Sequence, residues 1–328
     1  MISVVVPILN EAENLSELRL RVVEQLDRAG EAWELILVND GSSDGSAELM
    51  ARMHAQDARI KALVLSRTFG HQPAIAAGLS HARGDCVVLM DGDLQDPPEL
   101  IPALLERWRA GFQVVVAERR TRADRGLRGA ALRMFYPVFR WVSDNSSAPD
   151  AGVFGLMDRV VVDALGQIPE HNRYIPGLRS WLGFRQTAVP YDRQPRARGN
   201  PKQGWGHLTR YATDAVFGFS RVPLRLATVL GLCFTILSLT FGAAVVVRRF
   251  VFHQPVTTFG EMVVVGMLLG GVQLVSIGVL GEYVGRIYDE VRGRPHYVVS
   301  QTLGLAASTR SPTARLRSDD PAASSLAR

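Results

Sequence analysis

The chain has 328 residues, 47% hydrophobic content and a formal net charge of +5, with a pI of about 9.5. This length allows one large domain with an appendage, or two small domains, and two distant cysteines exclude a disulfide framework. Mild basicity suits a membrane surface, an anionic substrate or a nucleic acid, and selects none of them. The chain opens on an apolar run without a basic segment or a cleavage site, so no secretory signal is expected.

Short β-branched runs alternate with helical patterns over residues 1–165. Strands are predicted at Ser3–Val6, Leu35–Val38, Ala62–Leu65, Cys86–Met90 and Gln113–Ala117. The helical period predicts helices at Glu11–Arg28, Ser46–Gln56, Gln72–His81 and Pro97–Arg109. Asn10 followed by Glu13 predicts a capping box at the first of these helices. This order predicts an α/β fold with a mostly parallel sheet and helices on both faces.

Two stretches near the carboxyl end, 226–247 and 262–281, contain no charged residue. Each approaches the roughly 20 residues that cross a hydrocarbon core as a helix. A buried core helix is the alternative, but two such stretches in tandem favour two membrane spans. Arginines precede the first stretch and follow the second, whereas the loop between them carries only Arg248 and Arg249. This bias predicts a multi-pass protein of the bacterial plasma membrane with both termini in the cytoplasm.

Three parts follow from this pattern. Residues 1–222 are expected to form a cytoplasmic domain with interfacial helices near its end, and residues 223–285 a two-helix transmembrane hairpin. Residues 286–328 are expected to form a cytoplasmic segment, disordered beyond residue 308 because Ser, Ala, Pro and Arg dominate there.

Polar segments follow three of the predicted strands: Pro7–Glu11, Asn39–Gly45 and Asp91–Pro98. Ligands of open α/β sheets bind beyond the carboxyl ends of the strands, so a site is expected where these segments meet. In the third segment, Asp91 and Asp93 leave a strand one residue apart and can face one point. Carboxylates are ligands for Mg²⁺ or Mn²⁺, and the amide oxygen of Gln95 offers another. The alternative is an Asp/Gly turn that precedes a helix.

The other two segments leave two interpretations open. Asp40 can accept hydrogen bonds from a nucleotide's base or ribose, or belong to a tight loop. Asp44 favours a helix cap. Glu11, beside Pro7, either contacts the nucleotide or favours the start of a helix.

Together these segments resemble the inverting, GT-A-fold nucleotide-sugar glycosyltransferases. The resemblance is closest to the branch of dolichol-phosphate-mannose synthase and the bacterial polyprenyl-phosphate (bactoprenol) glycosyltransferases. It rests on VVVPILNEAENL, VNDGSSDGS, LSRTFGHQPAIAAGL, DGDLQDPPEL, GLMDRVVVDAL and RSWLGFRQTAVPYDRQPR, and it runs from residue 2 to about residue 290.

The resemblance implies transfer of a hexose from a nucleotide-diphosphate sugar, with UDP favoured, to polyprenyl phosphate with inversion. By that likeness the nucleotide-sugar pocket is lined by Pro7, Glu11, Asp40 and Asp91, and Mg²⁺ or Mn²⁺ is held by Asp91, Asp93 and Gln95. The acceptor phosphate is held by Arg119 and Arg133, and the catalytic residues are Asp93 and Arg119. The planar fork of an arginine suits a phosphate, although a solvated surface arginine is the alternative. An acceptor phosphate is already anionic, so positioning and electrostatics suffice and no catalytic histidine is assigned.

Some features depart from the family or leave its implications open. Relatives often read D-x-G-D-F-R-L-M where this chain has Val153 and Gly155, and a Lys-Tyr pair where it has Lys202 and Gln203. A processive polysaccharide synthase and a catalytically idle, nucleotide-binding membrane scaffold are the alternative functions. Motifs for dinucleotide and phosphate-loop binding are absent. No nucleic-acid partner is expected, and glycines at 266, 270, 271 and 278 permit helix packing in a homo-oligomer, dimer or tetramer.

Overall fold

A computed structural model describes residues 1–119, 151–170, 174–192, separate positions between 227 and 251, and residues 259–305. Arg133, nine of the 22 positions in the stretch 226–247 and the tail beyond residue 308 lie outside the described residues. The chain divides into two compact units. One comprises Met1–Leu132, Asn145–Lys202 and Arg294–Arg328, and the other comprises Arg133–Asp144 and Gln203–Gly293.

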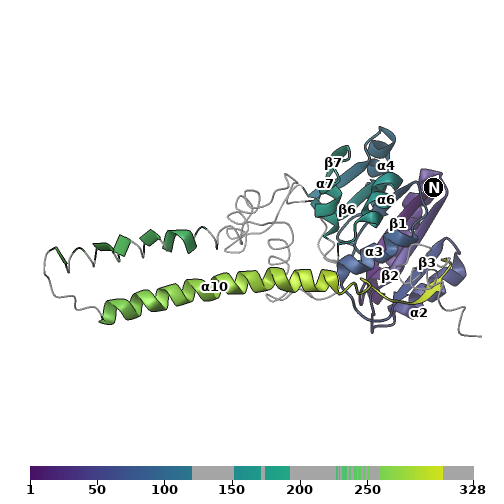
Figure 1. The fold of residues 1–328 in the computed structure, drawn as a ribbon. Coiled ribbons are helices and arrows are strands. Elements are labelled where there is room, and N and C mark those ends of the chain that lie inside the picture. Colours follow the sequence, from purple (N-terminus) through teal and green to yellow (C-terminus); the bar gives the residue numbers. More distant parts are fainter. Residues whose placement is uncertain are drawn as a thin grey trace, which may run out of the picture. The chain divides into compact units, whose positions relative to one another are not determined.

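The first unit is built on an eight-stranded sheet of order β7-β5-β6-β4-β1-β2-β3-β8 (Figure 1). Its strands are β1 (Ile2–Ile8), β2 (Trp33–Asn39), β3 (Ile60–Leu65), β4 (Cys86–Leu89), β5 (Val114–Arg119), β6 (Ala151–Asp158), β7 (Gln186–Tyr191) and β8 (Val299–Leu303). The five predicted strands are therefore confirmed. All seven residues of β1 and of β2 are buried, as expected of strands covered on both faces.

The sheet is mixed but mostly parallel, as predicted: β1 to β5 and β7 run in one direction, whereas β6 and β8 run in the other. The four strands β3, β2, β1 and β4 are parallel, whereas β6 runs antiparallel to both of its neighbours, β4 and β5. At the outer edge, β8 runs antiparallel to β3. Parallel strands require a crossover such as a helix, and the sequence shows such helices between each of the first five strands. No helical pattern in the sequence predicts the two strands that run in the opposite direction, β6 and β8.

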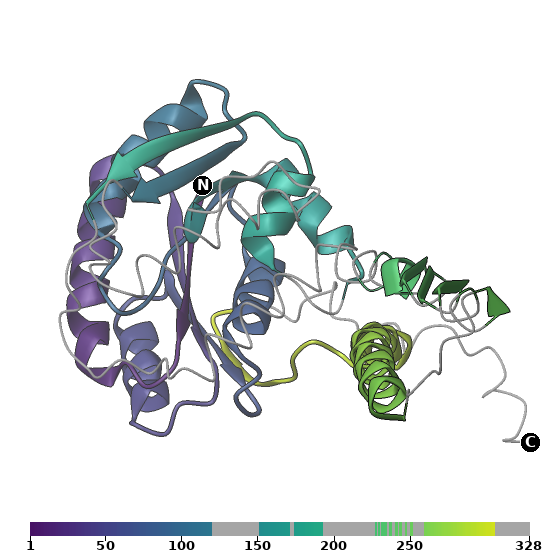
Figure 2. The ribbon, with the colours of Figure 1, turned by 90° about the vertical axis from the view of Figure 1, so that its left-hand side faces the viewer.

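Helices cover both faces of this sheet (Figure 2). On one face lie α1 (Ala12–Ala29), α2 (Ser46–Gln56) and α4 (Ile101–Arg109), which the short 3₁₀ turn η1 (Pro98–Leu100) precedes. On the other lie α3 (His71–His81), α6 (Arg159–Gln167) and α7 (Ile175–Trp181). The four predicted helices are confirmed, although the turn η1 opens the fourth.

The predicted capping box at α1 is wrong. Asn10 has a left-handed backbone, with φ of 53°, and its Oδ1 accepts from the amide of Ser43 at 2.8 Å. Asp44 instead accepts at 2.9 Å from the amide of Ala12, the first residue of α1. The same carboxylate accepts from the amide and the hydroxyl of Ser46, at 3.1 and 2.6 Å, where α2 begins. One side chain thus serves the starts of two helices, and a local motif could not show this.

Helix α3 lies very close to the sheet. A Cβ atom on its Gly78 would lie 2.3 Å from Cγ1 of Val5 and 3.0 Å from Cγ2 of Val38, which only glycine avoids. The position of α3, and of the residue that opens it, is therefore fixed against β1 and β2.

A C-terminal strap, residues 297–303, closes the β3 edge of the sheet. Its strand β8 pairs with β3, and the amide of Ser66 donates to the carbonyl of Val298 at 2.9 Å. The hydroxyls of Tyr297 and of Ser80 on α3 lie 2.8 Å apart. The sequence did not predict this strand.

The second unit contains the 33-residue helix α10 (Phe259–Val291). Apolar side chains along it are exposed, among them Leu274 at 71% and Val291 at 80%. Charged residues lie near both of its ends, Glu261 at the start and Glu282, Arg286 and Asp289 in the last turns. Within the described residues, no helix has the length together with the apolar character that crossing a membrane requires. The prediction of a membrane span at 262–281 is therefore not supported.

Candidate active site

The carboxyl ends of β1, β2 and β4 meet at one edge of the sheet. These strands are parallel, with Ile8 of β1 in register with Asn39 of β2 and Val5 with Leu89 of β4. The polar segments that follow them are therefore neighbours, as the strand order predicted.

Asp40, which follows β2, is buried, with 3% of its surface exposed. Its two carboxylate oxygens accept from the amides of Phe69, at 2.7 Å, and Gly70, at 2.9 Å. Burial raises the pKa of Asp40 above its ordinary value, and the two amides offset only part of this effect. Asp40 thus anchors the loop that leads into α3, and its contact with a nucleotide stays a prediction.

The acidic pair lies in a tight turn after β4. Asp93 is 8% exposed, and its Oδ1 accepts from the amide of Gln95 at 3.1 Å. Leu94, which lies between Asp93 and Gln95, adopts a left-handed backbone with φ of 60°. This conformation costs about 1–2 kcal/mol in a residue with a Cβ atom. The burial of the Leu94 side chain, 1% exposed, offsets this strain. Strained turns of this kind concentrate at functional sites.

The turn fits one kind of metal site. The described residues contain no group of three or more His, Cys, Asp or Glu side chains that could hold a metal ion by themselves. Mg²⁺ is commonly held by one or two carboxylates together with substrate phosphates and water. Asp91 and Asp93 fit that arrangement, in which the remaining oxygens come from the substrate. Gln95 contacts Asp93 through its main chain.

His71, the first residue of α3, lies beside the acidic turn, and the sequence did not point to it. Its Nε2 lies 2.9 Å from Oδ1 of Asp91, and the two side chains are 45% and 29% exposed. Desolvation lowers the pKa of His71, but the hydrogen bond to Asp91 and the charges of Asp40 and Asp93 outweigh it, so the net shift is upward. The polar segments that predicted the site directly follow the first, second and fourth strands, whereas His71 follows the third strand after a loop.

Arg119, the last residue of β5, is linked to the acidic turn by a chain of hydrogen bonds. Its Nε donates to the hydroxyl of Tyr191 at 3.2 Å, and that hydroxyl donates to Oδ1 of Asp96 at 2.6 Å. Asp96 is 1% exposed and lies three residues after Asp93. Burial and the charge of Asp96 raise the pKa of Tyr191, so the phenol keeps its proton. Sequence spacing gave no indication of Tyr191, which belongs to β7.

The other predicted nucleotide residues lie beside this edge. Pro7 is buried within β1, in register with Val38. Glu11 immediately precedes α1, and its Oε2 accepts from the side chain of Asn14 at 2.6 Å. This contact matches the interpretation of Glu11 as part of a helix start, and its contact with a nucleotide stays a prediction.

The departure at Gly155 has a structural counterpart in Arg179 of α7. A Cβ atom on Gly155 would lie 2.5 Å from the carbonyl oxygen of Val115 and 3.3 Å from Nη1 of Arg179. The Arg179 guanidinium thus lies where a side chain at 155 would begin. Arg179 is 2% exposed, its Nη2 donates to the carbonyl of Gly152 at 3.2 Å, and its Nε has no hydrogen-bond partner in the described part of the chain. Burial lowers the pKa of Arg179 to about 10.

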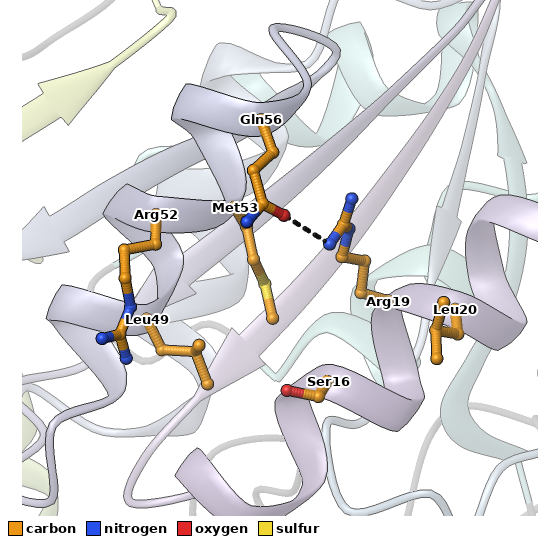
Figure 3. Close-up of a pocket in the computed structure, with 7 residues that line it drawn as sticks. All are labelled: Ser16, Arg19, Leu20, Leu49, Arg52, Met53 and Gln56. Atoms are coloured by element: carbon orange, nitrogen blue, oxygen red, sulfur yellow. Dashed lines mark hydrogen bonds between the residues drawn. The ribbon is translucent and has the colours of Figure 1, made fainter.

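A pocket of about 210 Å³ lies between α1 and α2 (Figure 3). Arg19 and Gln56, which line it, are joined by a hydrogen bond of 2.8 Å. None of its lining residues is acidic, and none comes from the strand ends described above. It therefore offers no carboxylate for a metal ion and is separate from the candidate site.

Comparisons with known proteins show the family of the chain. Residues 3–163 match the family model of glycosyl transferase family 2. The chain is also 40% identical over 305 residues to an uncharacterised glycosyltransferase of Synechocystis, a match that covers 93% of this chain and 96% of the relative. The chain therefore belongs to the family 2 glycosyltransferases.

Within that family, the chain is similar to proteins named for one lipid acceptor. It is 38% identical over 303 residues to the bactoprenol glucosyl transferase of Shigella phage SfII, which covers 92% of this chain and 98% of the relative. The resemblance to the bactoprenol glycosyltransferases is thus confirmed. A solved structure of glucosyl-3-phosphoglycerate synthase from Mycobacterium tuberculosis, with Mn²⁺, UDP-glucose and phosphoglyceric acid, is 20% identical, with a TM-score of 0.49, and covers 66% of this chain and 79% of that one.

Proposed function

We propose that the protein transfers one hexose from a UDP-sugar to polyprenyl phosphate, with inversion at the anomeric carbon. The observation that carries this proposal is the link between two kinds of group at one edge of the sheet. Asp91 and Asp93 supply carboxylates, and Arg119 supplies a cation that Tyr191 and Asp96 tie to the same turn. Glucose is the favoured hexose, since the similar phage protein is named a glucosyl transferase.

Asp91 and Asp93 would hold Mg²⁺ or Mn²⁺ against the donor, with Gln95 as a further contact. When bound, such an ion offsets the charge that develops on a departing nucleotide diphosphate. Asp93 is the more buried of the two acids, and its carboxylate is fixed by the amide of Gln95. The left-handed backbone of Leu94 brings the amide of Gln95 back to Asp93, so the turn itself orients the Asp93 carboxylate.

Arg119 would hold the acceptor phosphate, with Arg133 as a second arginine. The hydrogen bond from Nε to Tyr191 orients the guanidinium. Desolvation lowers the pKa of Arg119, but Tyr191 and the nearby acids raise it further, so the side chain stays charged. A phosphate is already a nucleophile at neutral pH, so the chain's task is to bring two anionic substrates into line and offset their repulsion.

The acceptor also explains the exposed apolar side chains of α10. A polyprenyl phosphate has its head group at the membrane surface and its tail in the hydrocarbon. We place the protein at the cytoplasmic face of the bacterial plasma membrane, with the apolar side chains of α10 against lipid. Holding the enzyme on that surface raises the effective concentration of the acceptor. Self-association into a dimer or tetramer belongs to the same proposal.

A transfer assay tests this function. Membranes that contain the protein are supplied with Mg²⁺ or Mn²⁺, polyprenyl phosphate and a panel of radiolabelled nucleotide sugars. One donor should label the lipid with a single sugar, and an α-linked donor should give a β-linked product. A retained anomeric configuration would refute inversion. Label in a long polymer would favour a processive synthase, and metal-dependent nucleotide binding without transfer would favour an idle scaffold.

A further inference from the structure

The segment Phe69–Gln72 connects three separate parts of the site. Its first two amides donate to the carboxylate of Asp40, at the end of β2. Its third residue, His71, contacts Asp91 after β4 at 2.9 Å. The side-chain oxygen of Gln72 accepts from the amide of Ile175, which opens α7, at 3.0 Å. The start of α3 is therefore fixed in place from several directions.

The chemistry of the contact between His71 and Asp91 sets its direction. An ionised carboxylate only accepts hydrogen bonds, so Nε2 of His71 must carry the hydrogen. The bond restricts rotation of the Asp91 carboxylate and so determines where its oxygens point. His71 itself cannot shift easily, because α3 is pressed against β1 and β2 at Gly78.

The exposure of His71 argues against a role in packing. Its side chain is 45% exposed, and it is not part of the hydrophobic core. Replacing it should therefore cost the fold little. What the side chain contributes is one directed hydrogen bond to an acid of the candidate metal site.

We propose that His71 is a positioning residue of the donor site, which holds the Asp91 carboxylate in the orientation that binds a divalent cation together with the nucleotide diphosphate. This inference rests on the proposed function only in taking a nucleotide diphosphate as the donor. Carboxylates that ligate metals are generally oriented by such partners, and losing the partner costs about tenfold to a hundredfold in metal affinity.

The test measures metal binding directly, without turnover. Mn²⁺ is titrated into the purified full-length protein in the presence of UDP, and free Mn²⁺ is followed by electron paramagnetic resonance. His71→Ala should weaken Mn²⁺ binding by about tenfold to a hundredfold. His71→Gln places an amide donor near the position of Nε2 and should restore most of the affinity. At saturating Mn²⁺, His71→Ala should recover most of the wild-type kcat, because the lost affinity is then compensated.

His54→Ala is the matched control. His54, on α2, also makes one hydrogen bond, from its Nδ1 to the carbonyl of Ile60 at 2.7 Å. Removing it should leave Mn²⁺ affinity unchanged. Wild-type affinity in His71→Ala would overturn the inference, as would a loss in His71→Gln equal to that in His71→Ala. Normal Mn²⁺ binding by a wild-type protein that transfers no sugar to lipid would instead refute the proposed function and leave this inference standing.

Discussion

The two ends of the central parallel strands carry buried acids in contrasting surroundings. At the amino ends, Glu34 is 1% exposed and accepts from the hydroxyl of Ser3 at 2.5 Å, from Nζ of Lys61 at 2.6 Å and from the amide of Arg83 at 2.7 Å. The lysine neutralises the charge of Glu34 within the fold. This end of the sheet therefore holds a structural ion pair.

At the carboxyl ends, acids accumulate. The described hydrogen bonds to Asp40, Asp93 and Asp96 come from neutral donors, namely main-chain amides and the hydroxyl of Tyr191. Such donors orient carboxylates without cancelling their charge. The comparison teaches that a single buried acid can belong to a structural ion pair, whereas several acids gathered at one end of the sheet mark a candidate site. Mutations at the two ends should therefore separate activity from stability.

The largest effect is expected at the carboxyl end. Asp93→Asn keeps the shape of the side chain but removes its charge, so transfer should fall by about a thousandfold, as for loss of a group that stabilises charge in the transition state. The melting temperature should change by only a few degrees, since the side-chain oxygen of Asn can still accept from the amide of Gln95. Sugar transfer and thermal unfolding measure the two quantities. Full turnover in Asp93→Asn after exhaustive chelation would contradict the assigned chemistry.

The opposite result is expected at the amino end. Glu34→Ala leaves Lys61 without its buried partner, which should lower the free energy of unfolding by about 3 kcal/mol. Transfer should persist at temperatures where the variant is folded. Urea denaturation measures the loss. Glu24→Ala breaks the exposed pair with Arg28 and should cost less than about 0.5 kcal/mol. Equal losses in both variants would remove the contrast.

Acid should weaken the amino end through the same carboxylate. Burial raises the pKa of Glu34, but Lys61, Ser3 and the amide of Arg83 together lower it further, so the folded pKa lies below the ordinary value of 4.5. The stability that Glu34 contributes is therefore present above about pH 4.5 and is lost as the pH falls through the folded pKa. Urea midpoints measured from pH 6 downward should fall less steeply in Glu34→Gln than in the wild type. Identical slopes would show that other acids govern acid unfolding.

The smallest effect is expected at Asp44, an acid at the carboxyl ends of the strands that serves the fold and not the candidate site. Asp44 lies there, yet its carboxylate serves the starts of α1 and α2. Desolvation raises its pKa, and the hydrogen bonds from Ser46 and Ala12 lower it below the ordinary value. Asp44→Ala should cost about 1 kcal/mol in the free energy of unfolding and leave UDP affinity unchanged. Weaker UDP binding at unchanged stability would move Asp44 into the site.

Sequence patterns predicted the parts of the fold whose physics is local. Strands β1 to β4 are short runs of buried, mostly apolar residues, which the chain shows plainly. In contrast, β6 is interrupted by Gly152 and Gly155, and the middle of β8 is exposed and polar. These strands form because they pair with neighbouring strands of the sheet. Such pairing depends on residues elsewhere in the chain, so the local sequence of β6 and β8 does not predict it.

The site divides in the same way. Asp91 and Asp93 were predicted because two acids directly follow a strand. His71 and Tyr191 were not, because they reach Asp91 and Asp96 across 20 and 95 residues of sequence. A hydrogen bond between distant residues depends on the packing of α3 and β7, which no local pattern encodes.

The C-terminal strap has a consequence for how the protein is made. Translation proceeds from the amino end, so β1 to β7 leave the ribosome long before the residues that pair with β3. Until Leu303 has emerged, the main-chain N–H and C=O groups at the β3 edge are free to pair with a strand of another chain. Completion of the sheet must therefore wait for synthesis of the whole of α10. A chain that stops short of Val299 would be released with that edge uncovered.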